Sequence, residues 1–420
     1  MALDGSRRRV VVTGMGVITP IGNSVQEYWQ ALLDGKSGAG PITQFDPSLY
    51  ETKFACEIKG FDPMNYMDRK LAQRADLFTL YGIAACQEAI KNSGLVLEKE
   101  DRERIGVIYG SGIGGMWTYH KQFLNFIQGG GPRLISPFFI PMLIPDIAAG
   151  RLAMIYGLKG PNYGTVSACA TSSHAIGDAW MHIQCGSADA MVAGGGEASI
   201  CPMGVGGFNA LKAISTRNDA PQKASRPFDK DRDGFVMGEG GGILVLEELE
   251  HAVKRSATIY AELGGIGFTG DAHHITEPAP GGEGAVRAMR IAIKSAGLTP
   301  NDVDHVNTHG TSTPVGDPAE TAAIKTVFGD RAKKIAINST KSMIGHLLGA
   351  SGVVESVATI MAIQTNKVHP TINLDMPDPA CDLNYIPHKA QDWNVNVAIS
   401  NTFGFGGHNA TLLFRRYQES

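Results

Sequence analysis

Residues 160–180 read GPNYGTVSACATSSHAIGDAW, with one cysteine, Cys169, among small residues at the centre. A valine-bearing run before it and an apolar stripe at helical spacing after it predict a strand, a tight turn and a helix. At a helix start, the macrodipole and free backbone N–H groups favour the thiolate, so we expect a lowered pKa for this thiol. An inert buried cysteine is the alternative, because free cysteine is among the most buried residue types. The stripe comprises Ala175, Ile176, Ala179, Trp180 and Ile183.

The same alternation of strand-like and helix-like runs extends along the whole chain. Continuous apolar strands between amphipathic helices predict an α/β architecture whose sheets are covered on both faces. The order of elements starts again after a junction near residues 250–258, which predicts two similar halves, 1–255 and 256–420. The strand-like runs lie at 8–19, 104–110, 188–197 and 241–249, and then at 259–274, 302–310, 334–342, 396–407 and 409–416.

Composition limits the class of protein. The 420 residues are 43% hydrophobic and 19% charged, which is typical of a globular chain with a sizeable core. A net charge of −4 gives no reason to expect nucleic acid as a partner, and no stretch approaches ~18 apolar residues, so we expect no membrane span. Six scattered cysteines favour a reducing compartment. We expect a cytoplasmic location, or a plastid or mitochondrial matrix if a transit peptide was removed.

Two motifs point to other functions. Residues 110–115, GSGIGG, fit a dinucleotide-binding turn, but no Asp or Glu follows within about 20 residues to bind a ribose. A nicotinamide oxidoreductase therefore stays only a distant alternative. Residues 228–240 begin like a calcium loop, but Gly240 stands where the bidentate glutamate belongs, so no calcium site is predicted.

Two histidines and a lysine lie in polar, glycine-rich segments that follow strands. His309 lies in VNTHGTSTPVGD, while Lys341 and His346 lie in STKSMIGHLLGASG. A third segment, ISNTFGFGGHN, surrounds Phe405 with glycines that allow a backbone N–H to approach a reaction centre. A lone histidine is more often structural, but two of them with a lysine and Cys169 form a candidate set for nucleophilic catalysis.

Together these segments resemble the β-ketoacyl-[acyl-carrier-protein] synthases over essentially the whole chain. GVGGFNALKAISTRND at 204–219 and Ile113 in GSGIGG are most similar to the synthase II subtype, and other stretches also resemble synthase I. The resemblance implies the thiolase fold, with two similar halves packed as five αβαβα layers. It also implies a homodimer that works with an acyl carrier protein and elongates fatty acids by decarboxylating condensation.

The resemblance assigns a role to each site residue. Cys169 accepts the acyl chain from phosphopantetheine, and His309 and His346 act as neutral donors when malonyl thioester loses CO2. Lys341 orders the site, and the backbone N–H groups of Cys169 and Phe405 form the oxyanion hole. Phe405 and Ile113 match gates to the malonyl site and the acyl pocket. Two further positions match residues that bind phosphopantetheine: Thr311 and Thr313.

Two groups of positions are carried over less directly. The resemblance requires no catalytic cofactor, but some members hold a structural Na⁺ or K⁺, here at Asn307, Thr308, Glu355, Ser400 and Asn401. Basic residues near the expected carrier-protein contact are Lys70, Arg74 and Lys212. The alternatives are a synthase I subtype, a polyketide-type ketosynthase, a thiolase or initiating synthase, or a non-catalytic partner resembling a chain-length factor.

Overall fold

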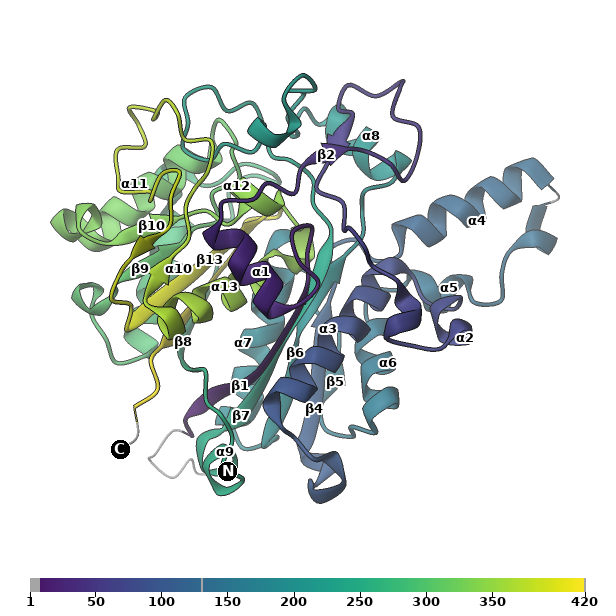
Figure 1. Ribbon diagram of the computed structural model, residues 1–420, viewed down its shortest axis with the longest axis horizontal. Helices are drawn as coiled ribbons and strands as arrows, with labels where there is room; N and C mark the ends of the chain where they lie inside the picture. The colour runs from purple at the N-terminus through teal and green to yellow at the C-terminus, as the bar shows by residue number, and fades with distance from the viewer. Residues whose placement is uncertain (1–7, 130, 419–420) are drawn as a thin grey trace.

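Ten strands form one continuous sheet within the part of the chain that the computed structural model describes, residues 8–129 and 131–418 (Figure 1). The spatial order is β10-β9-β13-β14-β8-β1-β7-β6-β4-β5. The strands of this sheet are β1 (Val10–Ile18), β4 (Ile105–Gly110), β5 (Asn162–Tyr163), β6 (Ala190–Glu197), β7 (Gly240–Glu248), β8 (Ala261–Gly270), β9 (His305–Asn307), β10 (Ala336–Asn338), β13 (Val397–Gly404) and β14 (His408–Arg415). Two short pairs lie outside it: β2 (Gly40–Pro41) with β3 (Phe54–Ala55), and β11 (Lys367–Val368) with β12 (Gln391–Asp392).

The two halves of this sheet have the same topology. Numbered along the chain within each half, the strands lie in the order 3-2-4-5-1, from β5 to β1 and from β10 to β8. The first strand of each half carries two glycines against a helix, where an added Cβ at Gly16 or Gly267 would lie 2.0 Å from a helix carbonyl oxygen. The duplicated order of elements predicted from the sequence is therefore confirmed.

The helices complete five layers. In the middle layer, α7 (Thr171–Gln184) and α13 (Ser351–Thr365) bury apolar side chains between the two halves of the sheet. One outer layer contains α3 (Leu77–Ser93) and α6 (Ile147–Tyr156), and the other contains α10 (Glu283–Ser295) and α11 (Gly316–Phe328) (Figure 1). The remaining helices are α1 (Val25–Leu33), α2 (Arg69–Ala72), α4 (Met116–Gly129), α5 (Phe139–Leu143), α8 (Pro202–Ala210), α9 (Leu249–Lys254) and α12 (Lys341–Ile344).

Helix α13 also explains one feature of the hydropathy profile. The helical stretch Leu348–Thr365 has the length and hydropathy of a membrane-spanning helix, but 83% of it is buried inside the protein. It is buried on most sides because it packs against α7 and against strands of both halves.

The segment around Cys169 differs in part from its prediction. The apolar stripe after it forms the buried face of α7, as predicted. The run before it contributes only the two-residue strand β5 and is otherwise irregular. Cys169 itself lies in a single 3₁₀ turn, Ala168–Ala170, that leads into α7 at Thr171. β5 is the edge strand at this end of the sheet and pairs with β4.

Candidate active site

The backbone around Cys169 is held in an uncommon conformation. Ala168 has φ +50°, in the left-handed region that non-glycine residues rarely adopt. Thr171 stabilises the turn, because its hydroxyl donates to the Ala168 carbonyl at 2.7 Å and accepts the Ser167 N–H at 2.9 Å. The turn presents the Cys169 thiol, 7% exposed, to a cavity of about 490 Å³.

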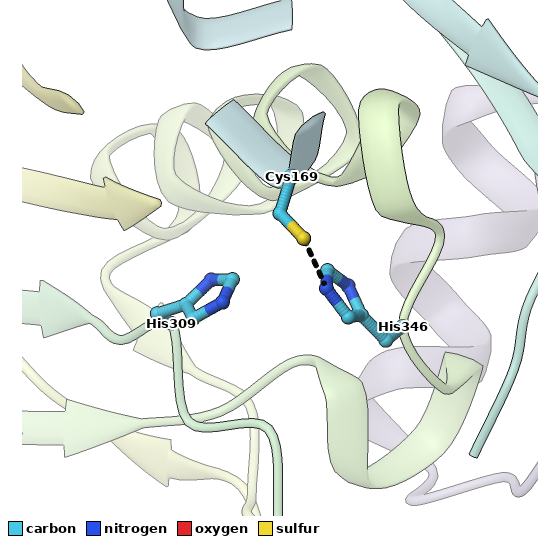
Figure 2. A group of neighbouring side chains, drawn as sticks. All are labelled: Cys169, His309 and His346. Carbon is cyan, nitrogen blue, oxygen red and sulfur yellow. Dashed lines mark hydrogen bonds between the residues drawn. The ribbon is translucent and has the colours of Figure 1, made fainter. Parts of the chain in front are cut away.

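Two imidazoles from the other half of the chain meet this thiol (Figure 2). His346 Nε2 lies 3.0 Å from Cys169 Sγ, and the His309 ring lies 5.2 Å from the His346 ring at 86°. His309 follows β9, and His346 follows β10 and α12. The structure thus brings Cys169 together with two histidines that lie 140 and 177 positions after it in the sequence.

Each histidine is positioned by its own neighbours. The carboxylate of Glu320 on α11 accepts the backbone N–H of His309 at 2.9 Å and of Gly310 at 2.8 Å. The His346 backbone N–H donates to Val236 O at 2.7 Å, and its Nδ1 lies 2.9 Å from the Ser351 hydroxyl. Because a hydroxyl both donates and accepts, Ser351 satisfies either neutral tautomer of His346.

Charge in the site departs from one prediction. Burial raises the pKa of the Cys169 thiol to about 12, although nearby Lys341 and the backbone N–H groups of Phe405 and Cys169 act to lower it. The prediction of a lowered thiol pKa was therefore wrong, because desolvation outweighs the helix start. Burial, followed by the Lys341 charge, holds the pKa of His309 and of His346 well below the usual range. Both imidazoles are neutral at physiological pH.

Lys341 acts on the site from within the core. It is 1% exposed and forms an ion pair with Glu355 on α13, which is fully buried. Burial raises the pKa of Glu355 to about 7 even with the cation beside it. Lys341 therefore supplies a fixed positive charge near both histidines.

Phe405 and its glycines lie against the Cys169 turn. The Phe405 N–H is directed at the thiol sulfur, as is the N–H of Cys169 itself. An added Cβ at Gly404 would lie 3.0 Å from Ser167 O and 3.1 Å from Cys169 N, so the two segments touch backbone to backbone. Two N–H groups that converge on one point can stabilise an oxyanion.

The cavity wall includes most of the predicted contact residues. Ile113, Phe405, Thr311, Thr313 and Lys212 all line it together with the catalytic candidates. The hydroxyl oxygens of the two threonines lie 3.0 Å apart. Lys70 and Arg74 lie elsewhere: Lys70 is exposed on α2, and the Arg74 guanidinium lies 4.3 Å from the Phe138 ring centre.

The five predicted cation positions are all buried around Glu355 and β13. Two oxygens there, Glu355 Oε2 and Ser400 Oγ, are buried and have no hydrogen-bond partner among the described residues. The others are bonded within the protein: Thr308 to Asn338 O, Asn307 to Thr340, and Asn401 to Glu320 and Thr411. Orphaned buried oxygens are the kind of group that an oxygen-liganded cation would satisfy.

Sequence reasoning missed three supporting residues, Glu320, Glu197 and Ser351. Glu320 and Ser351 lie in helices that follow the histidine segments, eleven residues after His309 and five after His346. Glu197 ends a predicted strand, a position where polar side chains often serve sites at the sheet edge. Strand ends and the first two turns of the following helices were the available signal.

Comparisons with known proteins agree over almost the full length. Residues 7–252 match the family model described as "Beta-ketoacyl synthase, N-terminal domain", and residues 260–375 match the corresponding C-terminal domain. Proteins named 3-oxoacyl-[acyl-carrier-protein] synthase 2 from Synechocystis sp. and Coxiella burnetii are 53% and 50% identical, over 98% of this chain and 99% of each relative.

Solved structures give the same result. A β-ketoacyl synthase from Burkholderia phymatum superposes with a TM-score of 0.91 at 37% identity, covering 98% of this chain and all of that one. A chain from a complex described as a type II polyketide-synthase acyl-carrier protein with its ketosynthase superposes with a TM-score of 0.92 at 35% identity. The match covers 98% of this chain and all of that chain.

Proposed function

Because the chain belongs to the β-ketoacyl synthase family, we propose that it condenses an acyl group held on Cys169 with malonyl-[acyl-carrier protein], releasing CO2. This is the elongation step of fatty acid synthesis, and the relatives at 50–53% identity are named for it. The observation that carries the proposal is the meeting of one thiol and two neutral imidazoles at the wall of a cavity.

The first half-reaction loads the enzyme. The sulfur of Cys169 attacks the acyl thioester, and the carrier's pantetheine sulfur leaves with the thiol proton. His346 Nε2, 3.0 Å from Sγ, is placed to carry that proton between the two sulfurs. The tetrahedral oxyanion forms where the N–H groups of Cys169 and Phe405 converge.

The second half-reaction extends the chain. The malonyl group loses CO2, and the electron pair of the broken C–C bond moves onto the thioester as an enolate. Neutral His309 and His346 donate ring N–H groups to its oxygen, because both pKa values lie well below neutrality. The resulting carbanion attacks the acyl carbon, and the Cys169 sulfur leaves as thiolate to be protonated again.

Exposed basic and apolar side chains indicate where two partners would bind, an acyl carrier protein and a second copy of the chain. The acyl carrier protein is acidic in this family, so Lys212 at the cavity and exposed Lys70 are the proposed contacts. A second copy of the chain is proposed to pack on the edge strand β5, on the projecting helix α4 and on the short helix α5 (Figure 1). These elements expose large apolar side chains: Phe123, Phe126, Ile127, Ile140 and Tyr163.

All six cysteines are free, which suits a reducing cytoplasm.

A structural Na⁺ or K⁺ is also proposed beside Glu355. The unpartnered oxygens of Glu355 and Ser400 fit such an ion, and bound there it would offset negative charge near Lys341 without entering the reaction.

Turnover by the purified chain tests the function. With acyl- and malonyl-carrier proteins, the wild type should release CO2 and form β-ketoacyl-carrier protein, while Cys169→Ala should form none. Cys185→Ala is the matched control, because Cys185 is exposed and outside the cavity. Condensation that persists in Cys169→Ala would refute the proposal.

A further inference from the structure

Glu197, at the end of β6, is a fully buried carboxylate that the mechanism above does not use. It accepts four hydrogen bonds. Its Oε2 accepts the backbone N–H of Gly112 at 2.8 Å and of Gly349 at 3.1 Å. Its Oε1 accepts the hydroxyls of Ser111 and Ser199, each at 3.0 Å.

These bonds hold both sides of Ile113. On one side the Gly112 N–H binds Glu197 directly. On the other side the Gly114 N–H donates to Ser111 Oγ at 3.0 Å, and the Ser111 hydroxyl in turn donates to Glu197. Ile113 faces the same cavity as Cys169 and is 36% exposed, so the carboxylate fixes one wall of that cavity from behind.

The same carboxylate ties this wall to a second one. Gly349 follows Leu348, which lines the cavity and has φ +47°. A Cβ at Gly349 would lie 2.3 Å from the Gly112 nitrogen, so the two segments meet backbone to backbone. A buried backbone N–H needs an acceptor, and Glu197 Oε2 accepts the N–H groups of both segments.

Building on the function proposed above, we propose that Glu197 is a positioning residue that clamps the Ile113 turn against Leu348 and thereby controls entry of the acyl chain during loading of Cys169. It contacts backbone on the Ile113 side of the cavity, which the family resemblance assigns to the acyl chain, and among the described residues it has no hydrogen bond to either histidine. Its effect therefore falls on acyl transfer to Cys169, before the malonyl group takes part.

The clamp depends on the charge of Glu197. All four partners donate, so the ionised form suits them, whereas a protonated carboxyl gives up one acceptor position. Burial raises the pKa of Glu197 to about 7, with the four hydrogen bonds acting to lower it. The titratable groups that face it are the Cys169 thiol and the Tyr109 phenol. Glu320 and Glu355 near the histidines also have a pKa of about 7, so the pH test compares variants.

Two matched pairs of variants isolate the clamp. Ser111→Ala and Ser199→Ala each remove one hydroxyl from Oε1, but only Ser111 links Glu197 to the Ile113 turn. Glu197→Gln and Glu239→Gln each neutralise a buried glutamate with a raised pKa. Glu239 binds Gln44 and the Ile58 N–H instead and does not line the cavity.

The measurement is the single-turnover rate at which acyl-carrier protein loads Cys169, followed by mass. Glu197→Gln and Ser111→Ala should load about tenfold more slowly, the scale of losing a hydrogen bond to a charged group, while the two controls stay within about threefold. Condensation by preloaded enzyme should change less than about threefold in all four. The ratio of wild-type to Glu197→Gln loading should fall toward one as the pH drops through about 7.

A second readout does not depend on the proposed function. Long-chain N-alkyl maleimides should alkylate Cys169 more slowly in Glu197→Gln and Ser111→Ala than in the wild type, as acyl loading does. N-ethylmaleimide needs no acyl pocket and should react at the wild-type rate in both variants. Equal rates in Ser111→Ala and Ser199→Ala would overturn the inference, as would a loss confined to condensation. If the variants and the wild type react with the maleimides in this pattern but the wild type loads no acyl group, only the proposed function is refuted.

Discussion

Replacing Lys341 by methionine tests the buried charge pair that sets the electrostatics of the site. Lys341 is 1% exposed and Glu355 is fully buried, and removing one partner of such a pair typically costs about 3–5 kcal/mol. The pKa of Glu355 is already about 7 with the cation present. Without the cation it rises further, so at pH 7 Glu355 takes up a proton, and the expected loss is about 3 kcal/mol.

The loss should grow with pH. In the unfolded chain Glu355 ionises near its ordinary value, while in the folded variant it stays protonated above neutrality. The folded state then binds more protons, so stability falls by about 1.4 kcal/mol per pH unit as pH rises. In the wild type this slope ends at about pH 7, where Glu355 ionises. At about pH 8.5 the variant should therefore be less stable than the wild type by about 5 kcal/mol.

Urea unfolding at both pH values measures these differences, with protein concentration held constant and Na⁺ and K⁺ left out of the buffer so that neither ion compensates Glu355. The double variant Lys341→Met/Glu355→Gln is the control, because it buries no charge at this position. It should recover a large part of the loss and remove the extra pH dependence. An equal loss at both pH values, or a double variant whose loss is the sum of the two single ones, would contradict the reasoning.

Three further changes test other parts of the site and fold. Glu320→Gln weakens the bonds that hold the His309 backbone, so condensation should slow about tenfold in single-turnover assays while loading changes little. Gly404→Ala places a Cβ 3.0 Å from Ser167 O, so loading of Cys169 should slow at least tenfold while urea unfolding shows only a modest change. The Glu247 hydrogen bond, opposed by burial, raises the pKa of His251, so its stabilisation is complete below about pH 6.5 and lost above the folded pKa. His251→Gln should therefore cost more stability at about pH 6 than at about pH 8.5, again by urea unfolding.

The duplicated fold could be predicted because strand and helix periodicities repeat in the same order in both halves. The glycines of β1 and β8 carry the same signal, since each allows a helix to pack against the first strand of its half. The short β5 could not be predicted. Its two residues have no periodicity of their own, and they pair only because β4 lies beside them.

The site was predictable where motifs carry it and unpredictable where burial decides. The segments of Cys169, His309 and His346 are recognisable in the sequence, and the structure brings them together. The thiol pKa could not be predicted, because its direction depends on how completely the turn is buried. Glu197 was missed because its four partners come from three segments, at 111–112, 199 and 349, and only the fold shows that they meet.

The central claim is that Cys169 carries the acyl group and that two neutral histidines discharge it onto the malonyl unit. Intact mass measured before and after a chase tests this most directly. After incubation with acyl-carrier protein, the wild type should gain one acyl group on Cys169, and malonyl-carrier protein should then remove it. His309→Ala should load but keep its acyl group through the chase. Acylation that persists in Cys169→Ala, or a chase that clears His309→Ala as fast as the wild type, would contradict the account.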